Sequence, residues 1–217
     1  MNLNSCPSCH CSKLYTLANA YKKCTQCHKK FSLKKLQKEI EIIETFCSNK
    51  NALETAKRLN LNYRTVSNKY MLYRKLIANY LDALYHANNN NDTSYEEYYY
   101  FTGQQKKEKN RSLYDAINII GFYKNQKVFT LLMPPLQKSF DNKSDNDYER
   151  YLYWNKLQSK NAYKTPLHVF FAFMEQNLKK YKGINKENFF YYLKESEFKY
   201  NFLIHEQIDI LKSLYFK

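Results

Sequence analysis

Two pairs of cysteines near the N-terminus have the spacing of a metal-binding site. Each pair is a C-x-x-C motif, and fourteen residues separate the two motifs, Cys6 with Cys9 and Cys24 with Cys27. A C-x-x-C motif can fold into a tight turn whose two thiolates point at one ion, and two such turns complete a tetrahedral site. Because four thiolates leave no open coordination position, the pattern predicts a structural Zn2+ ion without a catalytic role.

Neighbouring groups leave the exact ligand set open at this stage. His10 and Cys11 lie beside the first motif and His28 follows the second, so each could replace one thiolate. The alternative to metal binding is a set of free or disulfide-bonded cysteines, which the paired spacing makes less favourable. Cys47 lies at the end of an expected helix and is better explained as a small buried apolar residue.

The positive charge of the chain is concentrated in its first part. The 217 residues carry a formal charge of +15. Residues 1 to 85 contain 15 Lys and Arg against 5 Asp and Glu, a net charge of +10, which leaves +5 for the remaining 132 residues. A basic segment favours a polyanion as partner, because each phosphate that it neutralises releases condensed counterions.

Neither a membrane span nor an export signal is expected. The chain has no apolar stretch of about 18 residues, and its N-terminus runs into cysteines where a signal peptide would be apolar. Zinc bound by thiolates also suits a reducing compartment. We therefore expect a cytoplasmic protein without a membrane partner, associated with the nucleoid if it binds DNA.

Three helices are expected after the cysteine-rich segment, over residues 33–47, 51–59 and 63–86. Ser32 is the expected N-cap of the first, and the order of long helix, short helix, tight turn and basic helix is that of a helix-turn-helix. Apolar residues recur at intervals of three and four, which predicts the buried faces. These faces comprise Leu33, Leu36, Ile40, Ile43 and Phe46, then Leu53, Ala56 and Leu59, then Val66, Tyr70, Tyr73, Ile77, Leu81 and Leu84.

The start of the third helix offers side chains that match groups on double-stranded DNA. Arg can bind guanine, Asn adenine and Thr the thymine methyl group, while Lys and Ser can bind phosphates. An ordinary solvated helix face is the alternative for any single residue, but the charge and the cysteines favour DNA for the segment as a whole. The candidate DNA-binding residues are Asn62, Tyr63, Arg64, Thr65, Ser67, Asn68 and Lys69.

The second half of the chain is expected to hold strands first and helices after. A polar linker over residues 87–94 precedes expected strands at 95–101, 113–123 and 127–133, with a hairpin turn at 124–126 and Pro134 and Pro135 ending the third strand. Helices are expected at 148–157, 166–181, 188–200 and 205–215. The sequence thus predicts an α+β chain of three domains, residues 1–31, 32–87 and 95–217.

This arrangement resembles the small insertion-sequence transposases of the DDE class. The most specific match lies near the C-terminus, where a basic segment over residues 178–184 ends in Gly183-Ile184 and is followed by Lys-Glu-Ser-Glu-Phe-Lys-Tyr-Asn at Lys194 to Asn201. The resemblance covers most of the chain except the residues between Pro135 and Leu167. It implies a zinc ribbon, a helix-turn-helix and a shortened RNase H-like domain of about three strands plus C-terminal helices.

The same resemblance implies a two-metal catalytic site, but this sequence departs from the pattern. Glu96, beside Glu97, takes the place of the first aspartate, a loop residue such as Asp145 that of the second, and His168 that of the third acidic residue. The family's later basic residue falls at Glu175. A solvated strand face is the alternative for the glutamates, and a longer side chain suits the strict octahedral geometry of Mg2+ poorly.

We therefore expect a zinc-dependent DNA-binding protein derived from such a transposase, without strand-transfer activity. In this interpretation the C-terminal domain is a scaffold or makes a homo-oligomer. The alternative is an active transposase that uses Mg2+ at Glu96, Asp145 and His168 to cleave and join DNA. A transcription-type regulator would differ from the first interpretation only in its biological role.

Overall fold

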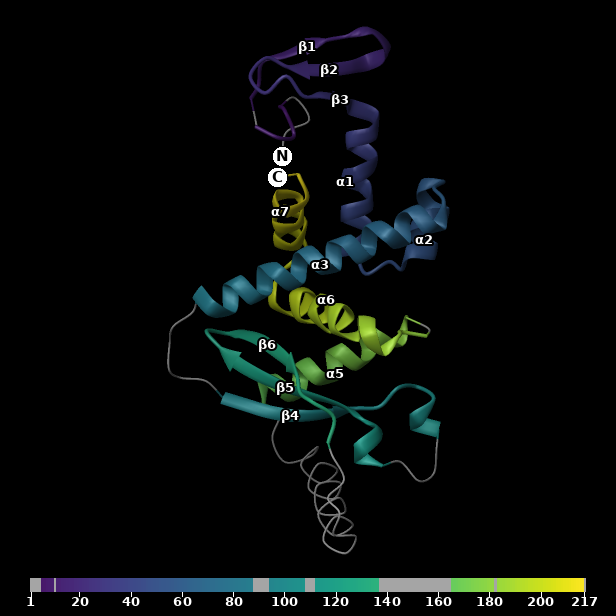
Figure 1. The fold of residues 1–217 in the computed structure, drawn as a ribbon, viewed down its shortest axis with the longest axis vertical. Helices are drawn as coiled ribbons and strands as arrows, with labels where there is room; N and C mark the ends of the chain where they lie inside the picture. Colours follow the sequence, from purple (N-terminus) through teal and green to yellow (C-terminus); the bar gives the residue numbers. More distant parts are fainter. Residues whose placement is uncertain are drawn as a thin grey trace, which may run out of the picture. The chain divides into compact units, whose positions relative to one another are not determined.

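The computed structural model describes residues 5–9, 11–87, 94–107, 112–136, 165–181 and 183–216. The chain divides into a first unit, Met1–Tyr80 with Phe202–Lys217, and a second unit, Leu81–Asn201 (Figure 1). Each unit contains helices and one three-stranded antiparallel sheet. The α+β class expected from the sequence is therefore confirmed.

The sheet of the first unit lies within the cysteine-rich segment. Strands β1 (Leu14–Thr16), β2 (Tyr21–Cys24) and β3 (Lys30–Ser32) pair antiparallel in chain order. β3 leads directly into helix α1 (Leu33–Cys47), where Ser32 Oγ accepts a hydrogen bond from the Lys35 N–H at 3.4 Å. Ser32 is thus the N-cap that the sequence predicted, and it joins the small sheet to α1 without a linker.

Helices α2 (Ala52–Leu59) and α3 (Tyr63–Ala87) follow α1 with defined ends. Asn51 and Glu54 form a capping box at the start of α2, and Asn60, in the left-handed region with φ 50°, ends it. The Asn62 side chain then accepts a hydrogen bond from the Arg64 N–H at 2.8 Å and caps α3. Asn60 and Asn62, two residues apart, cap the end of one helix and the start of the next, which explains the tight connection between the helices.

The predicted buried faces of α1 and α3 are largely confirmed. Phe46 packs edge-on against Tyr70, with ring centroids 4.8 Å apart, and against Tyr73 at 5.6 Å. The expectation for Leu53 is wrong, because 52% of this side chain's surface is exposed. The short helix α2 instead buries Thr55 and Ala56, and the Thr55 hydroxyl hydrogen-bonds the Tyr70 hydroxyl at 2.7 Å.

Helix α7 (Ile204–Tyr215) belongs to the first unit, whereas the sequence suggested that it lies in a domain of residues 95–217. The Tyr215 ring contacts the Tyr73 ring edge-on at 5.4 Å, and Lys212 pairs with Glu44 of α1 at 3.2 Å. The amphipathic pattern of α7 indicates that one face is buried, but it does not specify which helix covers that face. The difference therefore comes from long-range packing.

The second unit contains strands β4 (Ser94–Tyr100), β5 (Ile117–Lys124) and β6 (Lys127–Leu132), paired antiparallel in chain order. Asn125 and Gln126 form the β5–β6 turn with φ of 50° and 61°, the left-handed pair that a two-residue hairpin requires. The expectation of a strand from residue 113 is wrong at its start. Leu113–Asp115 is a 3-10 helix, whose Tyr114 N–H bonds the Ser112 hydroxyl at 3.3 Å.

Helices α5 (Pro166–Lys179) and α6 (Phe189–Asn201) complete the second unit. α5 packs against all three strands, and α6 packs against α5 and β6. At the crossing of α5 over β5, a Cβ atom at Gly121 would lie 2.9 Å from Phe171, so glycine permits the close approach. α5 ends two residues before the predicted end at Tyr181, and the helix expected over 148–157 lies outside the described residues.

Candidate metal site and nucleic-acid surface

The four predicted cysteines form one cluster in the first unit. Their Sγ atoms all lie within 4.8 Å of one another, with 3.5 Å between Cys6 and Cys27 and 3.4 Å between Cys9 and Cys24. Four thiolates at about 2.3 Å from a tetrahedral ion would have their sulfur atoms about 3.8 Å apart. The cluster is therefore of the right size and donor type to bind a metal ion.

Local backbone structure positions the two cysteine pairs. Cys24 is the last residue of β2, and its N–H bonds the Lys29 carbonyl at 3.1 Å across the second turn. In the first turn the Cys6 N–H bonds the Cys11 carbonyl at 2.9 Å. Backbone N–H groups of Cys27 and Gln26 lower the pKa of the Cys24 thiol to about 6. At Cys9 the Cys11 N–H lowers the pKa, but burial and contacts with the other thiols outweigh this effect and raise the pKa of Cys9 to about 12, so without an ion Cys24 is the thiol that ionises first.

Two of the three alternative ligands suggested by the sequence, Cys11 and His28, do not join this cluster. Cys11 Sγ instead approaches the Thr25 hydroxyl at 3.6 Å, and His28 is exposed, in the left-handed region with φ 59°. His10 lies outside the described residues. Cys47 is 1% exposed within α1, which confirms that it is a small buried residue. Among the described residues, the candidate metal ligands are therefore the four that the spacing predicted.

The start of α3 presents most of its candidate DNA-binding side chains to solvent. The exposed ones are Asn62, Tyr63, Arg64, Thr65 and Asn68, whereas Ser67 and Lys69 are partly buried. Lys69 Nζ lies 2.6 Å from Glu39 Oε2 and 3.0 Å from the Tyr215 hydroxyl, so its charge is already balanced within the unit. Of the two positively charged side chains in this segment, Arg64 is thus the one that is exposed to solvent.

Two of the three suggested catalytic residues are neighbours in the second unit. His168 Nε2 lies 3.3 Å from Glu96 Oε2, and the Thr165 hydroxyl donates to Glu96 Oε1 at 2.7 Å. The third residue, Asp145, lies outside the described residues. In the described ranges the four cysteines are the one group of three or more metal-binding side chains. Glu96 and His168 therefore form a contacting pair whose carboxylate already has two partners.

Glu175, where the resemblance implies a basic residue, is also engaged by its neighbours. Lys106 lies 2.7 Å from Glu175 Oε1, and the Tyr98 hydroxyl donates a hydrogen bond to the same oxygen. Burial, together with this bond to the carboxylate, raises the pKa of Tyr98. Tyr98, Lys106 and Glu175 therefore form a fixed polar contact between β4, the following loop and α5.

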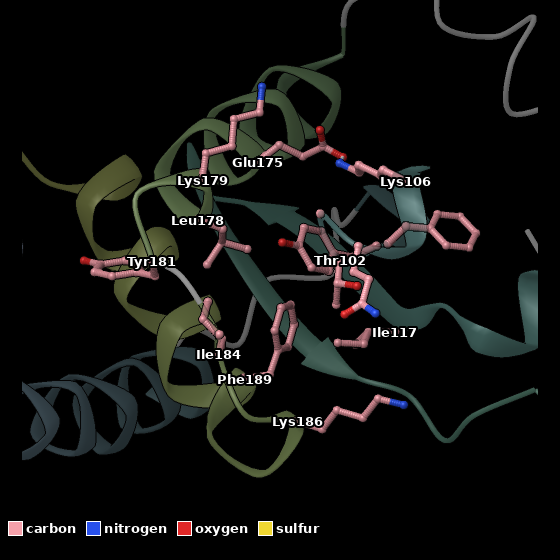
Figure 2. A pocket seen from close by; sticks show the side chains of 15 residues that line it. Thr102, Lys106, Ile117, Glu175, Leu178, Lys179, Tyr181, Ile184, Lys186 and Phe189 are labelled. Atoms are coloured by element: carbon pink, nitrogen blue, oxygen red, sulfur yellow. The ribbon is translucent and has the colours of Figure 1, made fainter. Parts of the chain in front are cut away.

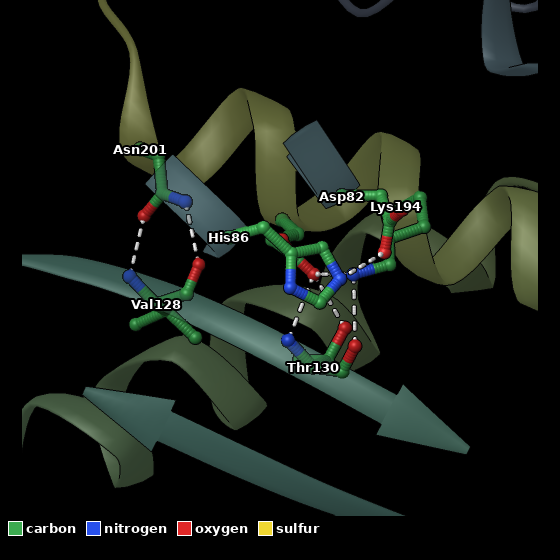
Figure 3. A network of polar contacts seen from close by, with 7 residues as sticks. Asp82, His86, Val128, Thr130, Lys194 and Asn201 are labelled. Carbon is green, nitrogen blue, oxygen red and sulfur yellow. Dashed lines mark hydrogen bonds and ion pairs between the residues drawn. The ribbon is translucent and has the colours of Figure 1, made fainter. Parts of the chain in front are cut away.

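The segment that carries the strongest resemblance forms a buried polar network (Figure 3). Lys194 Nζ donates to Glu197 Oε2 and to the Thr130 carbonyl, both at 2.8 Å, and Glu197 Oε2 accepts from the Thr130 N–H at 2.9 Å. The Asn201 amide binds the Val128 N–H at 2.8 Å and the Val128 carbonyl at 2.6 Å. This segment therefore holds α6 against β6, a role that the sequence reasoning missed.

The spacing of opposite charges within this segment could have predicted that the segment forms ion pairs on α6. Lys194 and Glu197 are three residues apart and therefore share a face of α6, as do Glu195 and Lys199, which pair at 2.5 Å. Both glutamates are fully buried, and burial raises the pKa of Glu197 against the opposing effect of Lys194. Figure 3 also draws the ion pair of Asp82 and His86, in which by contrast each of the two side chains is 71% exposed.

Comparisons with known proteins give no further assignment. None of the described helices combines the length and the apolar character needed to cross a membrane. Searches of protein-family models, of curated proteins and of solved structures each find no match for this chain.

Proposed function

We propose that this protein is a zinc-dependent protein that binds double-stranded DNA, derived from an insertion-sequence transposase and lacking strand-transfer activity. The observation that carries the proposal is the four-cysteine cluster, joined through β3 and α1 to a short helix and a basic helix in one unit. In this proposal the first unit comprises a zinc ribbon and a helix-turn-helix.

Zinc would supply folding energy to the small sheet. Its strands are only three or four residues long, and such a segment buries too little apolar surface to fold alone. A metal ion held by Cys6, Cys9, Cys24 and Cys27 would fix both turns and with them the entry into α1. The ion would have no open position for a reacting group, so it would act on structure alone.

The DNA contact would be made by the exposed first turns of α3. Asn68 lies four residues after Arg64 and three after Thr65, so the three side chains share one side of the helix, which suits reading of base edges in a major groove. Arg64 would bind a guanine edge in bidentate fashion. Lys69 contributes less than the sequence suggested, because its charge is paired with Glu39.

The contact between Glu96 and His168 favours a second candidate function, an active transposase. The two side chains that the resemblance assigns to metal binding do come together, at 3.3 Å. A two-metal site, however, needs several oxygen ligands that converge on the ions. Here the carboxylate faces an imidazole and a hydroxyl, and an imidazole suits Mg2+ poorly, so we prefer the inactive interpretation.

The DNA-binding proposal is tested by selecting a preferred duplex from random sequences and measuring binding across a salt series. We expect Arg64→Ala to weaken specific binding by about 1 to 3 kcal/mol. The matched control is Arg58→Ala, which removes the same charge from the exposed face of α2 and should spare sequence preference. If the full chain binds no duplex more tightly than about micromolar, the range of non-specific binding, the proposal is wrong.

Metal content and nuclease assays test the other two parts. The parent should hold one zinc per chain by elemental analysis, and Cys24→Ser should lose it, whereas Cys11→Ser and Cys47→Ser should retain it. The preferred DNA should stay intact when the parent is supplied with Mg2+ or Mn2+. Metal-dependent nicking that disappears in Glu96→Gln would establish the active transposase instead.

A further inference from the structure

A cavity in the second unit combines aromatic walls with unpaired positive charge (Figure 2). It has a volume of about 450 Å3 and lies between the end of β4, the loop after it, and the end of α5 with the residues that follow. Ligand pockets typically measure about 300 to 1,000 Å3. The cavity is therefore large enough for a small planar ligand and is separate from Glu96 and His168, which do not line it.

The walls favour a flat apolar group. Tyr100 and Phe189 lie with ring centroids 5.1 Å apart, and Tyr181 lines the cavity from the end of α5. The Tyr181 hydroxyl donates to the buried Glu195 at 2.6 Å and its ring packs edge-on against Tyr192 at 4.8 Å, so this side chain is directed away from the centre of the cavity (Figure 2). The partly exposed Tyr100 ring, with Lys106 Nζ 5.4 Å from its centroid, offers a surface on which a nucleobase can stack beside a positive charge.

The charges around the cavity favour an anion attached to that flat group. Lys106 is paired with Glu175, but Lys179 and Lys186 are exposed and have no acidic partner within the described part of the chain. They lie at opposite ends of the cavity lining in Figure 2. A ligand with a planar apolar body and flanking negative charges matches this arrangement, because each lysine can neutralise one phosphate.

We propose that this cavity binds one unpaired nucleotide of a DNA strand, with the base against Tyr100 and the flanking phosphates near Lys179 and Lys186. The base must be unpaired, since a base stacked within a duplex cannot reach into a cavity of this kind. The inference rests on the proposed function in that the DNA held by the first unit would supply the strand.

The experiment uses the full chain and a series of single-stranded oligonucleotides that carry one 2-aminopurine at successive positions. We expect the fluorescence to change at one position and not at its neighbours. Tyr100→Leu should weaken binding by roughly 5- to 150-fold, the range for loss of one stacking side chain. The matched control is Tyr95→Leu, which alters the same strand at a tyrosine that is 68% exposed and outside the cavity.

A second pair of variants tests the cavity without removing a side chain that packs in the fold. Gly103 lies at the cavity, and a Cβ atom there would meet nothing within 4 Å, so the site accepts a side chain. Gly103→Glu should bind the oligonucleotide about 2- to 5-fold more weakly than the neutral Gly103→Gln, because its charge repels phosphate.

The outcomes separate this inference from the proposed function. Equal fluorescence changes at all positions, equal affinities of the two tyrosine variants, or equal affinities of the two Gly103 variants would overturn the cavity inference. Preferential binding of an acidic aromatic peptide would overturn it as well. A positional signal without any duplex binding would support the cavity while refuting the proposed function of the first unit, and Arg64→Ala should affect duplex binding alone.

Discussion

Replacing Glu197 by leucine should strongly destabilise the second unit. Glu197 Oε2 accepts hydrogen bonds from the Thr130 N–H at 2.9 Å, the Thr130 hydroxyl at 2.5 Å and Lys194 Nζ at 2.8 Å. Glu197→Leu removes all three and leaves the ammonium group of Lys194, whose side chain is 5% exposed, without its counter-charge. Breaking one side of a buried ion pair costs about 3 to 5 kcal/mol, and we expect that loss here.

The double variant Lys194→Met/Glu197→Leu separates this cause from loss of packing. With no charge left unpaired, the remaining cost is that of the unpaired backbone groups of Thr130, about 1 to 3 kcal/mol. The control Lys212→Met breaks an ion pair in which Glu44 is 45% exposed, and it should cost less than about 1 kcal/mol.

Native-state hydrogen exchange of peptides from β6 is the appropriate measurement, because a single unfolding curve would mix the two units. The free energy of opening should fall most in Glu197→Leu and less in the double variant. If the double variant is at least as unstable as Glu197→Leu, the uncompensated charge is not the cause and the reasoning fails.

Two further substitutions test packing in each unit. Gly121→Ala would bring a Cβ atom to 2.9 Å from Phe171, so native-state hydrogen exchange of β5 peptides should show a loss of about 1 to 3 kcal/mol, whereas Gly103→Ala, with open space around its Cβ, should change that stability by less than about 0.5 kcal/mol. Tyr70→Phe would leave the buried Thr55 hydroxyl without its 2.7 Å partner and should cost about 1 to 3 kcal/mol in the first unit. If hydrogen exchange of α2 peptides is unchanged in Tyr70→Phe, that hydrogen bond does not stabilise the unit.

Local patterns predicted the elements well because the physics that sets them is local. The C-x-x-C spacing identified the cysteine cluster, and Ser32 marked the start of α1, since both depend on residues a few positions apart. The two-residue turn at Asn125 and Gln126 follows from the same short-range rules, although the sequence suggested a three-residue connection.

Pairings between distant residues could not be read from the sequence. Lys69 was expected to face DNA, but Glu39 and Tyr215 bind it, and Tyr215 is 146 residues away along the chain. The exposure of Leu53 has a similar cause, because the neighbours of α2 decide which of its faces is buried. Such contacts depend on which helices meet, and periodicity identifies a buried face without naming its partner.

The hydrogen bonds between α6 and β6 also determine how the sheet can grow. In the hairpin, Val128 and Thr130 direct their backbone N–H and C=O groups away from β5, which is where another strand would pair. Side chains of Lys194, Glu197 and Asn201 occupy all four of these groups. β6 is thereby closed to strand addition, which removes one route to aggregation. Any additional strand, from this chain or another, would have to join at β4, the opposite edge of the sheet.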